Sequence, residues 1–226
     1  MALTAPRGPL GTEPAGWFSA ALPPATVYTE PHPRRVQAIQ NGVTVIDTEE
    51  ALLVHRPDHF LRYAFPVEAV GNLPYRPAPT APGYVLVPWG AVDTWIEEGR
   101  VLVNYPPNPY HRVDCRPTRR RLSVVVSGTT LVETDYTTIV FETALEPRLY
   151  VAPAMVRTEY LRRSDTSTYC DYKGVATYWS AVIDGETYPD VAWSYDDPPS
   201  ESLPIKGYLS FDPDRTELDA ALPQSG

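Results

Sequence analysis

Residues 34–70 read RRVQAIQNGVTVIDTEEALLVHRPDHFLRYAFPVEAV, and residues 120–156 read RRLSVVVSGTTLVETDYTTIVFETALEPRLYVAPAMV. The two stretches align over 37 positions without a gap, at a constant offset of 86. Such matched spacing is hard to obtain by chance and predicts two copies of one structural unit. The identical pairs are Arg34 and Arg120, Arg35 and Arg121, Gly42 and Gly128, Thr44 and Thr130, Thr48 and Thr134, Val54 and Val140, Arg62 and Arg148, and Val70 and Val156, while Asp47 meets Glu133.

Each copy predicts a β-hairpin. A short run of alternating apolar residues reaches a turn, Asn41-Gly42 or Ser127-Gly128, and a second such run follows. Asn-Gly and similar dipeptides between two alternating runs are typical of tight hairpin turns, because glycine and asparagine tolerate a positive φ.

The second copy contains a segment that the first copy lacks. GYVLVPWGAVDTW (83–95) resembles GYLSFDPDRTELD (207–219), so the offset between the copies grows from 86 to 124, a difference of 38 residues. The additional segment contains STYCDYKGVATYW (167–179). It predicts a strand over 177–183, a tight turn at Asp184-Gly185 and a strand over 191–195.

Composition favours strands and ordered loops over helices. The chain of 226 residues has 26 prolines against 13 glycines and is 43% apolar, enough for a packed core. We expect at most a helical turn or two from Val92 and from Thr216.

The predicted architecture is mainly β: two tandem small antiparallel β-domains with tent-like or half-barrel sheets, packed as a pseudo-twofold pair, with few short helices. We expect an extended, proline-rich lead-in over 1–33, a first, shortened repeat over 34–111, a second, complete repeat over 112–215 and a tail over 216–226.

The combination of the two copies resembles the domain of unknown function 427 family. The resemblance rests on Arg148-Leu149-Tyr150, Thr168-x-Cys170-x-Tyr172-Lys173-Gly174, and Ala192-Trp193-Ser194-Tyr195 followed by Pro198, and it extends over roughly residues 34–212. It implies compact, mainly antiparallel β-domains, often paired and similar in topology to methionine sulfoxide reductase and thalidomide-binding domains. The chain is then a tandem two-copy member whose first copy is degenerate.

Charge and cysteine content exclude several classes of function. The net charge of −9 repels phosphate backbones and anionic lipids, so we expect neither nucleic acid nor a membrane as a partner. No leader or apolar span is evident, which predicts a cytoplasmic protein with Cys115 and Cys170 reduced. We expect no cofactor and no metal: Cys-x-x-Cys knuckles are absent, and Pro57 opposes a helix that would align His55 with His59.

Cys170 and Lys173 are the candidate catalytic residues. A nearby cation such as Lys173 would favour the reactive thiolate, but no histidine follows His111 in the sequence to act as a base. A buried residue at a pocket edge or in the core is therefore the competing interpretation of Cys170. Asp165 and Asp190 flank the segment and could orient Lys173 or act as a base.

The same segment is rich in aromatic residues that could wall a cavity. Alternation along a strand puts Tyr178 and Trp179 on opposite faces and Trp193 and Tyr195 on one face. The candidate ligand-binding residues are Arg148, Tyr150, Thr168, Cys170, Tyr172, Lys173, Gly174, Tyr178, Trp193 and Tyr195.

Three functions remain open from the sequence. The first is an uncharacterised β-domain protein that binds a small organic or anionic molecule in a pocket of the second repeat. The second is a thiol-dependent, nucleotide-processing or acyl-processing enzyme that uses Cys170. The third is an assembly domain without a ligand, and association into a homodimer is open in every case.

Overall fold

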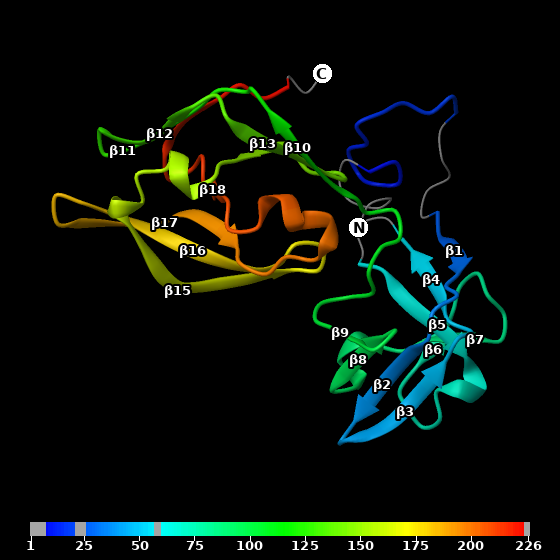
Figure 1. Cartoon of the computed structure of the whole chain (residues 1–226). Coiled ribbons are helices and arrows are strands. Elements are labelled where there is room, and N and C mark those ends of the chain that lie inside the picture. The colour runs from blue at the N-terminus through cyan, green and yellow to red at the C-terminus, as the bar shows by residue number, and fades with distance from the viewer. Residues whose placement is uncertain (1–7, 21–25, 57–59, 224–226) are drawn as a thin grey trace. The chain divides into compact units, whose positions relative to one another are not determined.

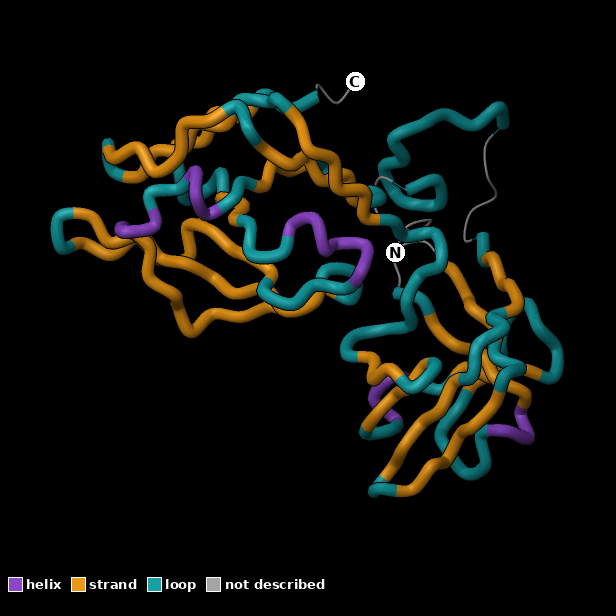
Figure 2. Tube along the Cα trace, in the orientation of Figure 1, coloured by secondary structure: helices purple, strands orange, loops and turns teal. Residues whose placement is uncertain are grey.

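The computed structural model describes residues 8–20, 26–56 and 60–223. The fold is mainly β, with several small antiparallel sheets, as the composition and the alternating runs predict. The helical elements are short 3₁₀ turns between strands (Figure 2). The chain divides into two compact units, Met1–His111 and Arg112–Gly226, each described by itself below.

The first unit contains two sheets, with strand orders β1-β4-β5-β7-β6 and β3-β2-β8-β9. Buried apolar residues of both sheets, such as Val36, Ile46, Leu53 and Phe65, form one core. The strands are β1 (Tyr28–Pro31), β2 (Val36–Gln40), β3 (Val43–Thr48), β4 (Leu52–His55), β5 (Arg62–Pro66), β6 (Arg76–Pro77), β7 (Tyr84–Leu86), β8 (Thr94–Glu97) and β9 (Arg100–Leu102), with 3₁₀ turns η1 (Val67–Ala69) and η2 (Trp89–Ala91).

The second unit contains three sheets, with orders β10-β13-β14, β12-β11-β19 and β15-β16-β17-β18. The third sheet lies opposite the layer formed by the other two, with the core between the layers (Figure 1). The strands are β10 (Val113–Thr118), β11 (Leu122–Val126), β12 (Thr129–Thr134), β13 (Thr137–Glu142), β14 (Arg148–Tyr150), β15 (Leu161–Cys170), β16 (Gly174–Ile183), β17 (Glu186–Tyr195), β18 (Leu209–Phe211) and β19 (Glu217–Ala220), with 3₁₀ turns η3 (Pro153–Met155), η4 (Thr158–Tyr160) and η5 (Ser200–Ile205).

The predicted hairpin turns are confirmed. Asn41 and Gly42 have φ values of 50° and 73° between β2 and β3, and Ser127 and Gly128 have 46° and 73° between β11 and β12. Asp184-Gly185, with φ values of 50° and 83°, connects β16 to β17. Two successive positive φ values match the right-handed twist of the flanking strands.

Strand register matches between the units at the offsets read from the sequence. Leu52 pairs with Ala64 in the first unit and Thr138 with Tyr150 in the second, 86 residues further on in both strands. Phe65 pairs with Val85 in the first unit. The equivalent residues of the second unit, Val151 at the offset of 86 and Leu209 at the offset of 124, also form a β-bridge. The described residues 70–83 hold only the two-residue strand β6, whereas β15, β16 and β17 occupy the corresponding part of the second unit.

Two helical predictions were wrong, because both segments form strands. Thr94–Glu97 is β8, paired with β2 and β9, and Glu217–Ala220 is β19, paired with β11. In β8 the side chains of Trp95 and Glu97 are the more buried ones, a period of two that fits a sheet. Tyr28–Pro31, within the predicted lead-in, forms β1 against β4.

Candidate functional site

A pocket of about 470 Å³ opens on the second unit beside the segment that distinguishes the two copies. Strands β13, β14, β16 and β17 and the turn before β16 contribute its walls. Six of the ten sequence-predicted binding residues line it: Arg148, Tyr150, Lys173, Tyr178, Trp193 and Tyr195. Side chains from four strands therefore converge on one space.

Lys173 reaches the pocket because of the turn that precedes β16. Gly174 has φ +86°, and a Cβ at this position would lie 3.3 Å from the Asp197 backbone oxygen. Glycine adopts this backbone conformation without strain and leaves room for the close approach of the Asp197 backbone. Ser202 Oγ donates to the Tyr172 backbone oxygen at 3.1 Å and thereby ties the turn to η5.

The partner of Lys173 is Glu142, the last residue of β13. Lys173 Nζ donates to Glu142 Oε2, and the two side chains are only 10% and 8% exposed. Lys173 Nζ also lies 5.9 Å from the centre of the Tyr195 ring, within the range of a cation–π contact. The pocket is therefore built around a buried ion pair, and a buried charge persists only when it is compensated in this way.

Sequence reasoning missed Glu142. A signal was present, since Glu142 closes the largely apolar run TTIVFE and the equivalent position in the first copy is Arg56. The sequence leaves open that Asp190 and Asp165 orient Lys173 or act as a base; the carboxylate paired with Lys173 is Glu142.

Aromatic residues of β16 and β17 form one wall of the pocket. Tyr178 pairs with Trp193 across the two strands, with ring centres 6.3 Å apart, and Trp193 Nε1 donates to Tyr150 Oη at 3.2 Å. The Arg148 guanidinium lies 5.1 Å from the centre of the Trp193 ring. Burial raises the pKa values of Tyr150 and Tyr195, so both phenols stay protonated at neutral pH.

Trp179 lies outside the pocket lining. It packs against the core between the two layers, and its Nε1 donates to Ser194 Oγ at 3.0 Å. Tyr178, one position earlier, faces the pocket. The alternation of a strand thus separates a pocket residue from a core-facing one.

Four of the sequence-predicted residues do not line the pocket: Thr168, Cys170, Tyr172 and Gly174. Thr168 Oγ1 lies 3.2 Å from Tyr178 Oη, and Tyr172 packs in the same apolar cluster as Cys170. Thr168, Cys170 and Tyr172 therefore lie next to lining residues without belonging to the lining.

Cys170 lies behind the Lys173–Glu142 pair, where its Sγ donates to Glu142 Oε1 at 3.9 Å. Burial, and to a smaller extent Glu142, raises the pKa of the Cys170 thiol, and Lys173 offsets only part of this effect. Burial likewise raises the pKa of Cys115, and both cysteines are free. A thiol that stays protonated at neutral pH is a weak nucleophile.

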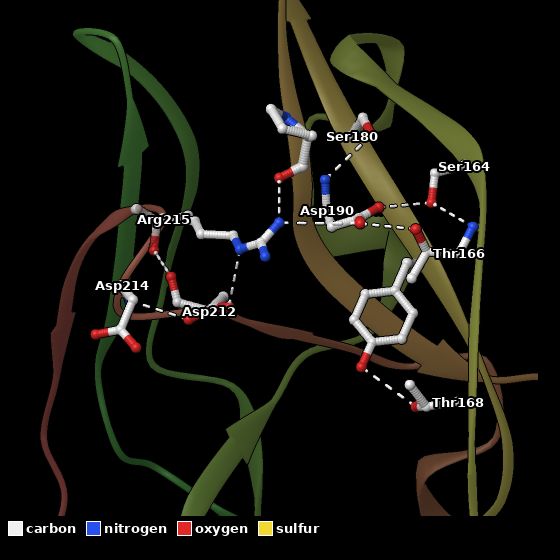
Figure 3. Close-up of polar contacts among 11 residues, drawn as sticks. Ser164, Thr166, Thr168, Ser180, Asp190, Asp212, Asp214 and Arg215 are labelled. Carbon is white, nitrogen blue, oxygen red and sulfur yellow. Dashed lines mark hydrogen bonds and ion pairs between the residues drawn. The ribbon is translucent and has the colours of Figure 1, made fainter.

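Asp190 organises a polar network with Ser164, Thr166 and Ser180 (Figure 3). Ser164 Oγ and Thr166 Oγ1 donate to its two carboxylate oxygens at 2.6 and 2.7 Å, and its backbone N–H donates to Ser180 Oγ at 3.1 Å. These hydrogen bonds, led by that from Ser164, lower the pKa of Asp190. Arg215 lies on the other side and donates to the Pro189 backbone oxygen at 3.0 Å.

The network joins two bulges that flank β16. Between the pairs Arg163–Trp179 and Ser167–Thr177, β15 advances by four residues while β16 advances by two. Between the pairs Ala181–Tyr188 and Trp179–Ala192, β17 likewise advances by four residues while β16 advances by two. Asp190, with φ +51°, sits in the second bulge and binds the hydroxyls of the first. Bulges interrupt the regular ladder, and these hydrogen bonds connect the two interruptions to each other across β16.

Residues 114–221 match the model of the family described as Domain of unknown function (DUF427). The second unit is a DUF427 domain. No curated protein sequence matches the chain. The DUF427 match contains every lining residue of the pocket, and the first unit precedes it.

The described residues meet neither the requirements of a metal site built from histidine, cysteine and acidic side chains nor those of a membrane-spanning helix. Among the described residues, no group of three or more histidine, cysteine or acidic side chains is placed to hold a metal ion. Within the same ranges, no helix has both the length and the apolar character needed to cross a bilayer.

Proposed function

We propose that the DUF427 domain binds a small organic molecule in the pocket between the Lys173–Glu142 ion pair and the aromatic residues of β16 and β17. The observation that carries this proposal is the convergence of Tyr178, Trp193 and Tyr195 with a buried ion pair on one space of about 470 Å³. Apolar walls with a few convergent polar groups are typical of small-molecule sites.

The charges of the lining favour an organic ligand over a simple anion. Three carboxylates, on Glu142, Glu146 and Asp212, face the pocket together with the cations of Arg148 and Lys173. Lys173 is already paired with Glu142, which leaves Arg148 as the cation best placed for a polar group of a ligand. We therefore expect a neutral or cationic aromatic compound to bind better than its anionic analogue.

A charge series of small aromatic probes tests this proposal. Benzamide, benzoate and benzylamine are similar in shape and differ in charge, and binding is followed by the NMR signal of the Trp193 indole N–H. Benzamide or benzylamine should shift this signal at lower concentration than benzoate. Absence of a shift with all three probes would contradict ligand binding at this site.

Matched variants locate the binding. Trp193→Phe removes a pocket indole and its hydrogen bond to Tyr150, whereas Trp179→Phe makes the same exchange outside the pocket lining. The first should weaken probe binding, read from tyrosine ring signals, and the second should leave it unchanged. Native mass spectrometry of the purified chain adds a direct search for a co-purified small molecule.

The alternative functions have less support. The raised pKa of the Cys170 thiol disfavours a thiol-dependent enzyme that uses this residue. A domain that serves assembly alone does not explain why polar and aromatic side chains converge on a pocket. A cytoplasmic location and a homodimer remain proposals from the sequence.

We also propose that the first unit is a shortened copy of the DUF427 domain. The matched registers support this interpretation, and so do two ion pairs at equivalent positions, Arg35 with Asp47 and Arg121 with Glu133. A test is a search of sequences related to residues 28–111 alone: such relatives should align with DUF427 domains over β10 to β14, and failure to align would contradict common origin.

A further inference from the structure

A second pocket, of about 380 Å³, lies in the first unit, outside the DUF427 match. Five of its lining side chains are aromatic, and four of them form two stacked pairs. The rings of Trp89 and Trp95 have centres 5.2 Å apart at 19°, and those of Phe60 and Tyr105 have centres 4.6 Å apart at 16°. Large rings gathered from four separate segments provide flat apolar surface for a planar ligand.

The inner wall of this pocket is held in place by hydrogen bonds. Trp95 is almost completely buried, and its Nε1 donates to the Trp89 backbone oxygen at 2.8 Å. Tyr63, equally buried, donates its hydroxyl to Glu97. Both aromatic side chains are therefore fixed in orientation before any ligand arrives, which lowers the entropic cost of binding.

Glu97 anchors this wall as a carboxylate. It accepts hydrogen bonds from His32 at 2.8 Å and from Arg34 at 2.5 Å. Burial by itself raises the pKa of Glu97, but the hydrogen bonds from His32, Tyr63 and Arg34 outweigh it and lower the pKa to about 2. The anchor therefore keeps its charge at any physiological pH.

The charges at this pocket differ from those of the rest of the chain. Arg62 and Arg76 contribute to the lining, and no carboxylate belongs to it among the described residues. The whole chain carries a net charge of −9, and the pocket of the second unit is lined by three carboxylates. Guanidinium groups bind carboxylate, phosphate and sulfonate groups through paired hydrogen bonds.

From these observations we propose that the first unit binds a planar aromatic molecule that carries an anionic group. The ring system packs against Trp89, which Trp95 supports by stacking, and the anionic group binds Arg62 and Arg76. The first unit then has a ligand site of its own, in addition to any role as a scaffold for the second unit.

Calorimetric titration of the full chain with three probes tests this proposal. 2-Naphthoate is planar and anionic, 2-naphthamide is planar and neutral, and decalin-2-carboxylate is anionic and not planar. We expect 2-naphthoate to bind at least about tenfold more tightly than either of the others, since each lacks one of the two interactions. Undetectable binding of 2-naphthoate, or equal affinity for 2-naphthoate and 2-naphthamide, overturns the proposal.

Variants assign the interaction to this pocket. Arg76 is exposed, so Arg76→Gln should leave the fold intact, weaken 2-naphthoate about tenfold and leave 2-naphthamide unchanged. Arg116→Gln, at an exposed arginine of the second unit that lines neither pocket, is the matched control and should leave both affinities unchanged. An Arg116→Gln effect as large as that of Arg76→Gln contradicts the assignment, and Trp89→Leu should weaken both planar probes.

Discussion

Lys173 Nζ donates to Glu142 Oε2, and this buried pair joins the turn before β16 to the end of β13. The two residues are 31 positions apart in the sequence: Lys173 lies in the turn between β15 and β16, and Glu142 ends β13 of a different sheet. The ion pair lines the pocket of the second unit together with the aromatic residues Tyr178, Trp193 and Tyr195. It also couples the stability of the domain to the proposed site.

Lys173→Met should destabilise the second unit by about 3 kcal/mol, because Glu142 would remain buried without a compensating charge. The double variant Lys173→Met, Glu142→Gln should recover much of this loss, since the isolated charge is gone. Urea denaturation of the two single variants and the double variant measures the coupling. Lys206→Met, which removes an exposed lysine 3.7 Å from Asp197, is the control and should change stability by less than about 0.5 kcal/mol. Additive effects of the two pocket substitutions would contradict the coupling.

Cys170 should be alkylated slowly at neutral pH. Because burial raises the pKa of its thiol, the thiolate fraction at any given pH is smaller than in a free cysteine. The rate of reaction with iodoacetamide, followed by mass spectrometry from pH 6 to pH 10 in a Cys115→Ser background, should still be rising where the rate of a model peptide has levelled off. A plateau at lower pH than the peptide would revive the nucleophile interpretation.

Gly174→Ala should cost more stability than Gly128→Ala. Both glycines have positive φ, +86° and +73°, so both substitutions carry a backbone cost of about 1–2 kcal/mol. Only at Gly174 would the new Cβ meet other atoms, with the Asp197 backbone oxygen at 3.3 Å, whereas Gly128 has open space. Denaturation midpoints of the two variants provide the comparison, and equal losses would show that the contact with Asp197 relaxes freely.

Asp190→Asn should destabilise the second unit at neutral pH by about 1 kcal/mol, because the hydrogen bonds from Ser164 and Thr166 lose their charged acceptor. The folded-state pKa of Asp190 lies below its unfolded value, so its contribution is complete above the unfolded pKa and is lost as the pH falls through the folded pKa. The difference in the free energy of unfolding between wild type and variant should therefore shrink from pH 7 to pH 3.

Asp184→Asn, an exposed turn position with φ +50°, is the control and should leave the free energy of unfolding nearly unchanged at both pH values. A difference that does not depend on pH would contradict an ionic role for Asp190.

Local rules were enough to predict much of the fold. Asn41-Gly42, Ser127-Gly128 and Asp184-Gly185 each form the predicted turn, because two successive positive φ values are available only to a few residue types. The period of two likewise separates Tyr178 from Trp179 correctly. These features depend on residues close together in the chain, so the sequence contains all the information they need.

Features that depend on distant strands were missed. The segments at Val92 and Thr216 are compatible with a helical turn or a strand, and pairing with β2 and β11 selects the strand. The sequence leaves open whether Asp190 orients Lys173 or acts as a base, but its carboxylate accepts hydrogen bonds from Ser164 and Thr166 in the bulge of β15. A bulge shifts side chains from one face of a sheet to the other, and the alternation of apolar and polar residues along the strand does not predict where a bulge occurs.

The sequence by itself determined the strand-rich class, the hairpins, the family resemblance of the second unit and six of the residues that line its pocket. The tertiary structure alone revealed that Glu142 lies beside Lys173, that Cys170 lies behind the lining and that the first unit has an aromatic pocket with two arginines. The physical reason is the range of the interactions. Turn conformation and alternation are set within a few residues, whereas a buried charge is compensated by whichever side chain the strand register brings opposite it.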